Sequence, residues 1–242
     1  RSELFVVMTA GFASVAGSTL VGYALLGAPL PFLLAATVMN APGALYIAKM
    51  MYPETEEPAS EGGVRDVRDT ESANVIDATA RGAIAGGRIA VIVGCLLIAF
   101  IALIALANGL LGGVGEWFGY DGLTFQKVLG WAFAPVAWLI GVPWDEAGQA
   151  GTYIGEKTVL NEFVAYADFG PDIKNLSDQT VIIVTFAPAG FANFASIAIQ
   201  IGAIGGLAPD RRGEVAQLGL RALLAGSLVN LANAAIAGVV AS

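Results

Sequence analysis

The sequence predicts an all-α membrane protein with several transmembrane helices, and its composition and the length of its apolar runs carry that prediction. Of the 242 residues, 56% are hydrophobic and only 13% are charged, whereas a soluble domain carries about a quarter charged residues. The mean hydropathy is +0.71. The apolar residues are gathered into runs of about 20, the length that crosses the hydrocarbon core of a bilayer. A lipid bilayer is therefore the expected environment, and the net charge of −8 provides no basic surface for nucleic acid.

Five apolar runs are long enough to be membrane segments: Leu4–Leu26, Pro31–Tyr52, Ile89–Leu111, Gln179–Gly206 and Ala216–Val240. Residues 53–88, between the second and the third, start with the acidic tract "PETEEPASEGG" and continue as "ESANVIDATARGAIAGGR". This pattern predicts a polar loop followed by an amphipathic helix with small residues on one side. We interpret the acidic tract as a solvated loop without a site. The chain opens at Arg1 without an initiator Met, so we expect an N-terminal part to be missing.

The basic residues predict the orientation of the segments. Nine of the twelve Lys and Arg residues flank the start of the chain or two other stretches: Arg1, Lys49, Arg65, Arg68, Arg81, Arg88, Arg211, Arg212 and Arg221. The positive-inside rule makes those stretches cytoplasmic. The first apolar run then leads outward, and alternation of the later runs puts the C-terminus on the outer side of the cell membrane. Everything between Leu111 and Gln179 must enter and leave at the outer face.

Residues 124–170 predict a re-entrant helical hairpin. Trp131–Val142 is only about half a span, is bracketed by Pro135 and Pro143, and precedes a polar, patchily apolar stretch that contains Glu156 and Glu162. Two short helices that dip into the membrane and turn back fit this pattern, because irregular backbone at membrane depth must be sheltered by protein. Two full spans would give the same topology, but the short first arm argues against them.

A repeated tetrapeptide predicts two interrupted helices. The run "AGFA" occurs at Ala10–Ala13 and again at Ala189–Ala192, followed closely by Ser14 in the first case and Asn193 in the second. A glycine and a polar side chain at mid-membrane suit a broken helix, whose freed backbone groups need partners. Small residues are also common where membrane helices pack together. For Ser14 alone, a packing role and a site role both stay open.

The surroundings of the two runs also match. Each interrupted segment is followed by another helix that carries an asparagine, Asn40 in "TVMNAPGAL" and Asn230 in "SLVNLANAA". The first broken helix runs outward and the second inward, which favours an inverted repeat formed by residues 1–52 and 179–242. Corresponding breaks in two inverted halves are the best sequence indication of a transporter's binding site. We therefore expect the chain to form part of an inverted-repeat transporter fold.

Glu162 is the strongest single candidate for a functional residue. A carboxylate at membrane depth costs several kcal/mol unless it is paired or hydrated, so it is functional by default. The alternative is a structural pair with Lys157, which is five residues earlier and poorly placed for a helical contact. Asn193 and Ser196 are three residues apart and share a helix face, with Phe191 close by.

The residue inventory weighs against other function classes. The chain has no His and its only cysteine is Cys95, so disulfide and redox chemistry are not expected. An intramembrane enzyme could use Glu162 as a base, but no nucleophile or metal-ligand pair accompanies it. A passive channel or a membrane assembly subunit would need the small residues only for packing. A secondary transporter of a small polar metabolite fits better.

Three stretches resemble the concentrative nucleoside transporter family. "GEKTVLNEFVAY" at Gly155–Tyr166 matches that family's Asn-Glu-Phe signature, and "GFASVAGSTLVGYALLG" and "GFANFASIAIQIGAIGGLAPDRRGEVAQLGLRALLAGSLVNL" resemble its two discontinuous helices. The resemblance covers the whole chain and implies its C-terminal portion, starting after a first re-entrant hairpin. It also implies a homotrimer with Ile89–Leu111 at its centre, import of nucleosides by elevator-like motion, and coupling to an ion.

The resemblance also implies roles for individual residues. By position, Glu162, Asn193 and Ser196 match residues that hold the ribose hydroxyls, and Phe191 matches an aromatic residue that borders the base. Thr19 matches a position on the first broken helix that faces the base, where the family often has Val, so its effect on selectivity stays open.

The implied coupling ion is Na⁺, with H⁺ as the alternative. Ser14 and the backbone carbonyl of Val15 match half of the family's Na⁺ site, and hard cations take oxygen ligands of this kind. The other ligands belong to the first hairpin, whose Gln-Thr/Ser-Glu run has no counterpart in this chain. No other cofactor is expected.

Overall fold

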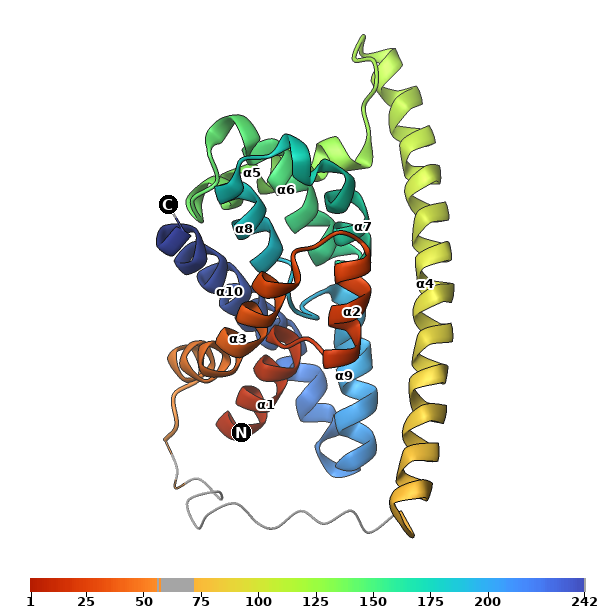
Figure 1. Cartoon of the computed structure of the whole chain (residues 1–242), viewed down its shortest axis with the longest axis vertical. Coiled ribbons are helices and arrows are strands. Elements are labelled where there is room, and N and C mark those ends of the chain that lie inside the picture. Colours follow the sequence, from red (N-terminus) through yellow and green to blue (C-terminus); the bar gives the residue numbers. More distant parts are fainter. Residues whose placement is uncertain (56, 58–71, 242) are drawn as a thin grey trace.

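The computed structural model describes residues 1–55, 57 and 72–241, and helices dominate them (Figure 1). The elements are α1 (Ser2–Ala13), α2 (Gly17–Leu25), α3 (Leu30–Met51), α4 (Val75–Trp117), α5 (Phe125–Leu139), α6 (Trp144–Val159), α7 (Glu162–Asp172), η1 (Ile173–Asn175), α8 (Asp178–Phe186), α9 (Phe194–Leu207), η2 (Pro209–Arg211) and α10 (Arg212–Ala241). The described residues contain no strand. The predicted all-α fold class is confirmed.

Three helical stretches of the described chain are long and apolar enough to cross a bilayer. They are Ser2–Leu25, Leu30–Met51 and Pro209–Val240, and they correspond to the first, second and last predicted runs. The fourth predicted run, Gln179–Gly206, forms the separate helices α8 and α9. The chain is therefore a multi-pass membrane protein.

The third predicted run is part of a much longer helix. We expected an amphipathic helix ending near Arg88 and a separate membrane segment from Ile89, but α4 continues without a break for 43 residues. No proline interrupts this stretch, and a glycine costs a helix only about 1 kcal/mol. At about 1.5 Å per residue, α4 is roughly 65 Å long, twice the thickness of a hydrocarbon core. Part of it must lie outside that core.

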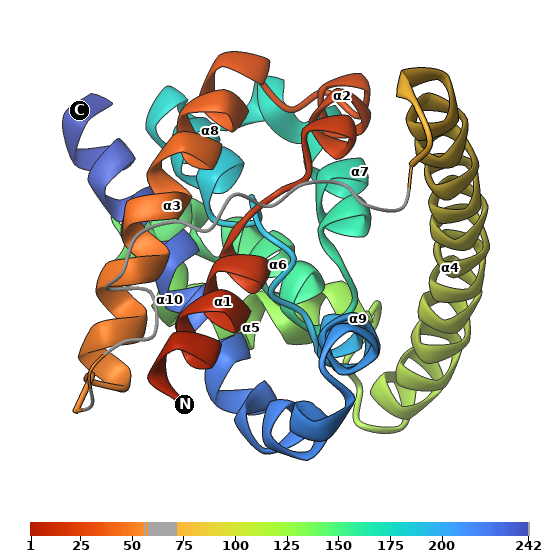
Figure 2. The same ribbon diagram turned by 90° about the horizontal axis from the view of Figure 1, so that it is seen from below.

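Helix α4 stands beside the other helices rather than among them (Figures 1 and 2). It packs mainly on α5, where the Asn108 side chain accepts from the Phe125 N–H at 2.7 Å and donates to the Gln126 side chain at 3.2 Å. Side chains along it such as Val91, Ile98 and Leu106 are exposed in the single chain. The predicted loop over residues 58–71, with Arg65 and Arg68, lies outside the described residues.

Residues 124–170 contain two changes of direction instead of one. The Trp131–Val142 segment is not a separate arm, because α5 already begins at Phe125 and accommodates Pro135 in its interior. The chain bends by 115° between α5 and α6, around Gly141 with its φ of +106°, a conformation that favours glycine. It turns again at Leu160 and Asn161, where α7 begins to pack on α6.

Two hydrophobic clusters hold the helices together. One gathers α2, α3, α6, α7 and α8 around the buried rings of Tyr23, Tyr153, Tyr166 and Phe169. The other joins α1 to α10 through Phe5, Met8, Phe12 and Leu218. Both clusters flank the interruptions of the two broken helices and fix where those interruptions lie.

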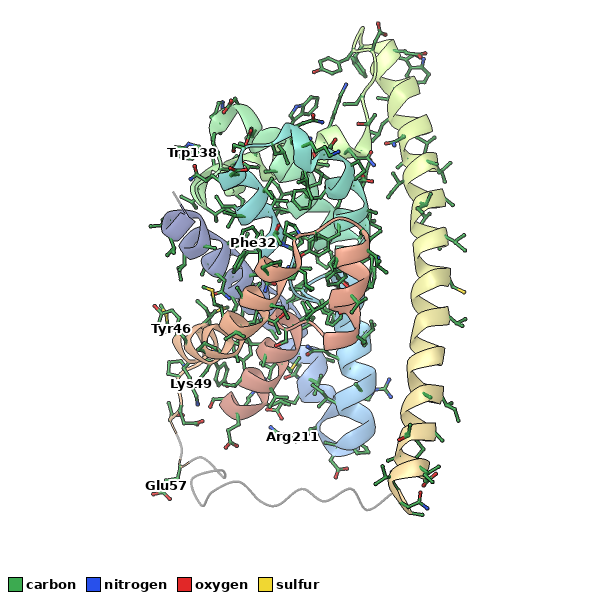
Figure 3. The ribbon with its side chains drawn as sticks, viewed as in Figure 1. Phe32, Tyr46, Lys49, Glu57, Trp138 and Arg211 are labelled. Carbon is green, nitrogen blue, oxygen red and sulfur yellow. The ribbon has the colours of Figure 1, made fainter. Side chains whose placement is uncertain are left out.

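The basic residues Lys49 and Arg211 lie at the same end of the molecule. Figure 3 shows Lys49, Glu57 and Arg211 at one end and Trp138 towards the other. Lys49 is in the last turn of α3 and Arg211 closes η2. Gathering of these basic residues at one end is what the positive-inside rule requires, while the side of the membrane that this end faces stays a prediction.

Candidate functional site

The two broken helices meet at their interruptions. Ser14, Val15 and Ala16 connect α1 to α2, and residues 187–193 connect α8 to α9. The N–H of Phe191 donates to the Ser14 carbonyl at 3.4 Å. A Cβ on Gly190 would lie 2.5 Å from the Ala13 carbonyl oxygen, so only glycine permits this approach.

The repeated "AGFA" runs do not occupy equivalent positions in the two halves. The first, Ala10–Ala13, is the last turn of α1, whereas the second, Ala189–Ala192, lies in the connection after α8 has ended at Phe186. Pro188 contributes to the difference, because proline has no N–H to donate and cannot continue the hydrogen bonding of α8.

Asparagines from the following helices satisfy the carbonyls freed at the two breaks. Asn230 on α10 donates to the carbonyls of Ala13 and Ala189 at 2.9 and 3.1 Å, and Asn40 on α3 also donates to Ala189 at 2.9 Å. The side-chain oxygen of Asn40 accepts from Asn230 at 3.2 Å and from Asn233 at 2.9 Å. This is the arrangement that interrupted helices need, since buried acceptors without partners are costly. We call Asn40, Asn230 and Asn233 the asparagine junction.

Glu162 lies beside this crossing, at the start of α7, and is only 3% exposed. Its Oε1 accepts from the Tyr23 hydroxyl at 3.1 Å, and its Oε2 accepts from the Asn193 side chain at 3.2 Å. Three segments that are far apart in the sequence therefore meet at one carboxyl. Asn161 positions that carboxyl by capping α7 and accepting from the Val164 N–H at 3.1 Å.

Asn193 and Ser196 form the opposite side of the same cluster. Asn193 caps α9, and its Oδ1 accepts from both the N–H and the hydroxyl of Ser196 at 2.9 Å. Both side chains are buried. A capping asparagine is common at a helix start, but here its amide group is left to bind Glu162. The cluster thus links one acid, one amide and one hydroxyl in a chain of hydrogen bonds, with Asn193 between Glu162 and Ser196.

The other predicted site residues lie around this cluster. Thr19 is half-buried on α2, donates to the Ala16 carbonyl at 2.7 Å, and neighbours Tyr23 one turn later. Phe191 is half-buried in the connection before α9, and Ser14 and Val15 lie in the connection after α1. The structure thus brings all seven predicted residues to the crossing of the broken helices, while their roles towards ligands stay predictions.

Lys157 does not form the predicted structural alternative, a direct ion pair with Glu162. Its ammonium group donates to Asn230 Oδ1 at 3.3 Å, and no described salt bridge joins it to Glu162. The two side chains still attract each other electrostatically. Lys157 thereby supplies a positive charge near the carboxyl and leaves the carboxyl oxygens to Tyr23 and Asn193.

Sequence reasoning missed Tyr23 and Tyr166. Tyr23 donates to Glu162, and its ring lies 4.7 Å from that of Tyr166 and 4.8 Å from that of Phe163. The Tyr166 hydroxyl donates to the Thr185 carbonyl at 2.8 Å. Tyr166 is the aromatic residue that ends the Asn-Glu-Phe signature. Its contact with Tyr23 joins two segments that are far apart in the sequence, so no local sequence pattern predicts it.

A sequence model described as "Na+ dependent nucleoside transporter C-terminus" matches residues 32–238. The chain belongs to this family. The resemblance to concentrative nucleoside transporters, drawn from the Asn-Glu-Phe signature and the two broken helices, is confirmed.

The curated relatives of this chain include transporters from bacteria and mammals. The chain is 56% identical over 240 residues to "Uncharacterized transporter YutK" of Bacillus subtilis, covering 99% of this chain and 59% of that protein. It is 45% identical to "Nucleoside permease NupC" of Helicobacter pylori, covering 98% and 57%. It is 38% identical to "Sodium/nucleoside cotransporter 1" of Rattus norvegicus, covering 98% and 39%. The chain therefore spans less than three fifths of the length of these relatives.

Solved transporter structures have the same fold. A structure of CNTnw in an inward-facing substrate-bound state matches with a TM-score of 0.90 at 54% identity, covering 98% of this chain and 56% of that one. A CNTnw variant in an outward-facing state matches with a TM-score of 0.93 at 53% identity, covering 98% and 58%. The fold described above is thus the fold of the C-terminal region of this nucleoside transporter family.

Proposed function

We propose that the protein containing this chain imports nucleosides by secondary active transport coupled to Na⁺. The observation that carries the proposal is the buried cluster of Glu162, Asn193 and Ser196 at the crossing of two broken helices. Relatives named as a nucleoside permease and a sodium/nucleoside cotransporter support it. Transport of another small polar metabolite is the alternative.

The cluster suits the hydroxyls of a ribose. An ionised carboxylate can accept from two neighbouring hydroxyls, and charge-assisted hydrogen bonds are strong in a site without bulk water. Asn193 and Ser196 can each donate and accept, so they complete a polar ring around a sugar. Tyr23 already donates to Glu162 and keeps its carboxyl in place between the broken helices.

The aromatic and small side chains beside the cluster suit a nucleobase. Phe191 directly precedes Ala192 and Asn193 in the α9 connection, so a base attached to a sugar on Asn193 would lie against its ring. Thr19, on the facing broken helix, would border the other edge of the base. Its hydroxyl is directed to the Ala16 carbonyl, which leaves its methyl group as the surface for the base.

The connection after α1 suits one half of a Na⁺ site. Ser14 has extended backbone, with φ of −86° and ψ of 161°, so its hydroxyl and the Val15 carbonyl lie outside regular helix. Oxygen ligands of this kind are those that Na⁺ prefers. Two ligands are too few for a complete site, and the first hairpin of this family's transporters would supply the others. Coupling to H⁺ is the alternative.

The large exposed apolar surface of α4 suits burial between protomers of a homotrimer, with α4 at the centre. The remaining helices would then form a transport domain that moves past α4 in an elevator-like manner. Similarity to both inward-facing and outward-facing structures supports such a motion. The C-terminus would lie on the outer side of the cell membrane.

Uptake by the full-length protein in proteoliposomes tests this function. An inward Na⁺ gradient should drive saturable accumulation of uridine above its external concentration, and recovery of unmodified uridine would separate transport from an enzyme reaction. Equilibration without accumulation would indicate a channel. Accumulation that ignores Na⁺ and follows a pH gradient would refute the assignment of the ion.

A further inference from the structure

A second buried carboxyl lies in α6, away from the sugar cluster. Glu156 is 0% exposed. Within the described chain, neither of its carboxyl oxygens lies in good hydrogen-bonding geometry with a partner. The neighbouring Lys157 does not serve it, because its ammonium group binds Asn230 and interacts with Glu162. A carboxylate in such a place is costly unless something neutralises it.

A polar cavity lies between α5, α6 and α7, about one helical turn from Glu156. This open cavity of about 400 Å³ is lined by Gln126, Gln149, Thr152, Tyr153, Ala167, Asp168, Pro171 and Asp172. Glu156 follows Thr152 and Tyr153 by about one helical turn, so it lies on the same face of α6. Its side chain interacts with two lining residues, Asp168 and Gln126. The buried carboxyl on α6 therefore lies next to the cavity and meets a second carboxyl, that of Asp168 on α7.

No salt bridge among the described residues involves either carboxyl, and Lys174, on the η1 turn that follows α7, is exposed. On α5, the Lys127 ammonium group donates to the Gly122 carbonyl at 2.6 Å. On α7, Asp172 is engaged by Tyr153 at 2.7 Å and by Gln149 at 2.9 Å. The titratable residue that α8 contributes is Asp178, in its first turn. The groups around Glu156 are thus acidic or uncharged.

The geometry also decides between a metal ion and a proton. Among the described residues, no group of three His, Cys, Asp or Glu side chains is placed to hold a metal ion. Two facing carboxyls need only one proton to avoid facing charges, and such pairs are known to share one. Asp168 is exposed, so it gives the pair a route to water.

We propose that Glu156 and Asp168 form a proton-binding site that is separate from the nucleoside site and holds one proton between the two carboxyls at neutral pH. Loss of that proton leaves two negative charges face to face between α6 and α7. The packing of these helices next to Glu162 then weakens, so nucleoside uptake falls as the pH rises. This consequence for uptake rests on the proposed function, but the proton site does not.

Infrared spectroscopy of the purified full-length protein tests the site without nucleoside. A protonated carboxylic acid has a carbonyl stretch that moves in D₂O. The wild type should show this band at neutral pH, and Glu156→Gln should lose it. Asp168→Asn should keep the band, because Glu156 remains. The pH at which half of the band is lost should fall by about one unit or more, because the variant lacks the neighbouring acid and interacting acids shift each other by that amount.

Glu146→Gln is the matched control on the same helix. Burial alone would raise the pKa of Glu146, but hydrogen bonds from Thr180 and Ser177 outweigh burial and lower it. Glu146 is therefore ionised at neutral pH, and its replacement should leave the band unchanged. A band that is absent from the wild type, or that survives Glu156→Gln, would overturn the proton site.

The uptake measurement is read separately. The fall of uridine uptake with rising pH should be lost in Glu156→Gln, because this variant carries no proton to lose. An unchanged pH profile, together with the expected infrared result, would overturn the link to transport and leave the proton site standing. If the Glu156 variant folds poorly, Asp168→Asn still allows both tests. Its lower midpoint should then appear both in the pH titration of the infrared band and in the pH dependence of uptake.

Discussion

Glu162→Gln is the most informative single change, because it separates ligand binding from structural support. In the structure, the carboxyl of Glu162 accepts one hydrogen bond from Tyr23 and one from Asn193. A glutamine keeps the shape of the side chain but loses the charge and replaces one accepting oxygen by a donating amide. The contact with Asn193 or with Tyr23 can survive through the remaining oxygen.

The expected loss of nucleoside affinity follows from the kind of bond that is removed. A hydrogen bond to a charged group contributes about 1.5–3 kcal/mol, which corresponds to roughly ten- to a hundredfold in the dissociation constant. Protein level and assembly should change little, because a neutral amide is cheaper to bury than a carboxylate. Lys157 keeps its hydrogen bond to Asn230 in the variant, so its ammonium group still has an acceptor.

A double cycle of protein and substrate measures the effect. Dissociation constants for ribonucleosides and for the matching deoxyribonucleosides are determined on wild-type protein and on Glu162→Gln, in the full-length protein. The analogue that lacks the hydroxyl held by Glu162 should bind the wild type more weakly, yet should lose much less affinity on mutation. The two losses should therefore be strongly non-additive, as expected for groups in contact.

Strictly additive losses for every deoxy analogue would refute the reasoning. Glu162 would then not contact the sugar, and its role would be structural, through Tyr23, Asn193 and the attraction of Lys157. A large drop in protein level for the glutamine variant would also indicate a structural role for Glu162.

Three further predictions test the ion site, the helix breaks and the topology. Ser14→Ala should raise the Na⁺ concentration for half-maximal uptake, and an unchanged concentration would remove Ser14 from the ion site. Asn230→Leu should leave the Ala13 carbonyl unsatisfied, at about 1–3 kcal/mol, and the Ala189 carbonyl with the Asn40 donor alone, so the melting temperature in detergent should fall clearly; an unchanged value would contradict the role of the asparagine junction. In a Cys95→Ala background, Glu146→Cys and Ala167→Cys should both react with an impermeant thiol reagent from outside, and labelling from the cytoplasm alone would refute the orientation.

The helix breaks were predictable because their requirements are local. Gly190, Pro188 and the polar Ser14 and Asn193 lie in apolar surroundings, and such residues are hard to fit into an unbroken membrane helix. Asn40 and Asn230 could be noted as polar residues in apolar helices. That both bind the carbonyl of Ala189 could not be foreseen, since this contact depends on how α3 and α10 pack.

Two misjudged boundaries have a common cause. The sequence predicts Pro135 as the edge of a short arm, and it predicts a helix boundary near Arg88, where polar sequence changes to apolar sequence. Both lie inside regular helices, because a change in polarity does not interrupt backbone hydrogen bonding, and a single proline can be tolerated. Tyr23 was missed for another reason, since its bond to Glu162 spans 139 residues.

The asparagine junction has a thermodynamic consequence for transport. It joins the chain after α1 and after α8 to α3 and α10, so the two breaks have a fixed separation and must be displaced together. A pocket that keeps its shape binds its ligand equally well on either side of the membrane, and a ligand with equal affinity for two states cannot change their relative populations. Nucleoside alone would then leave the balance between the inward-facing and outward-facing forms where it was, and the coupling ion would have to supply the bias.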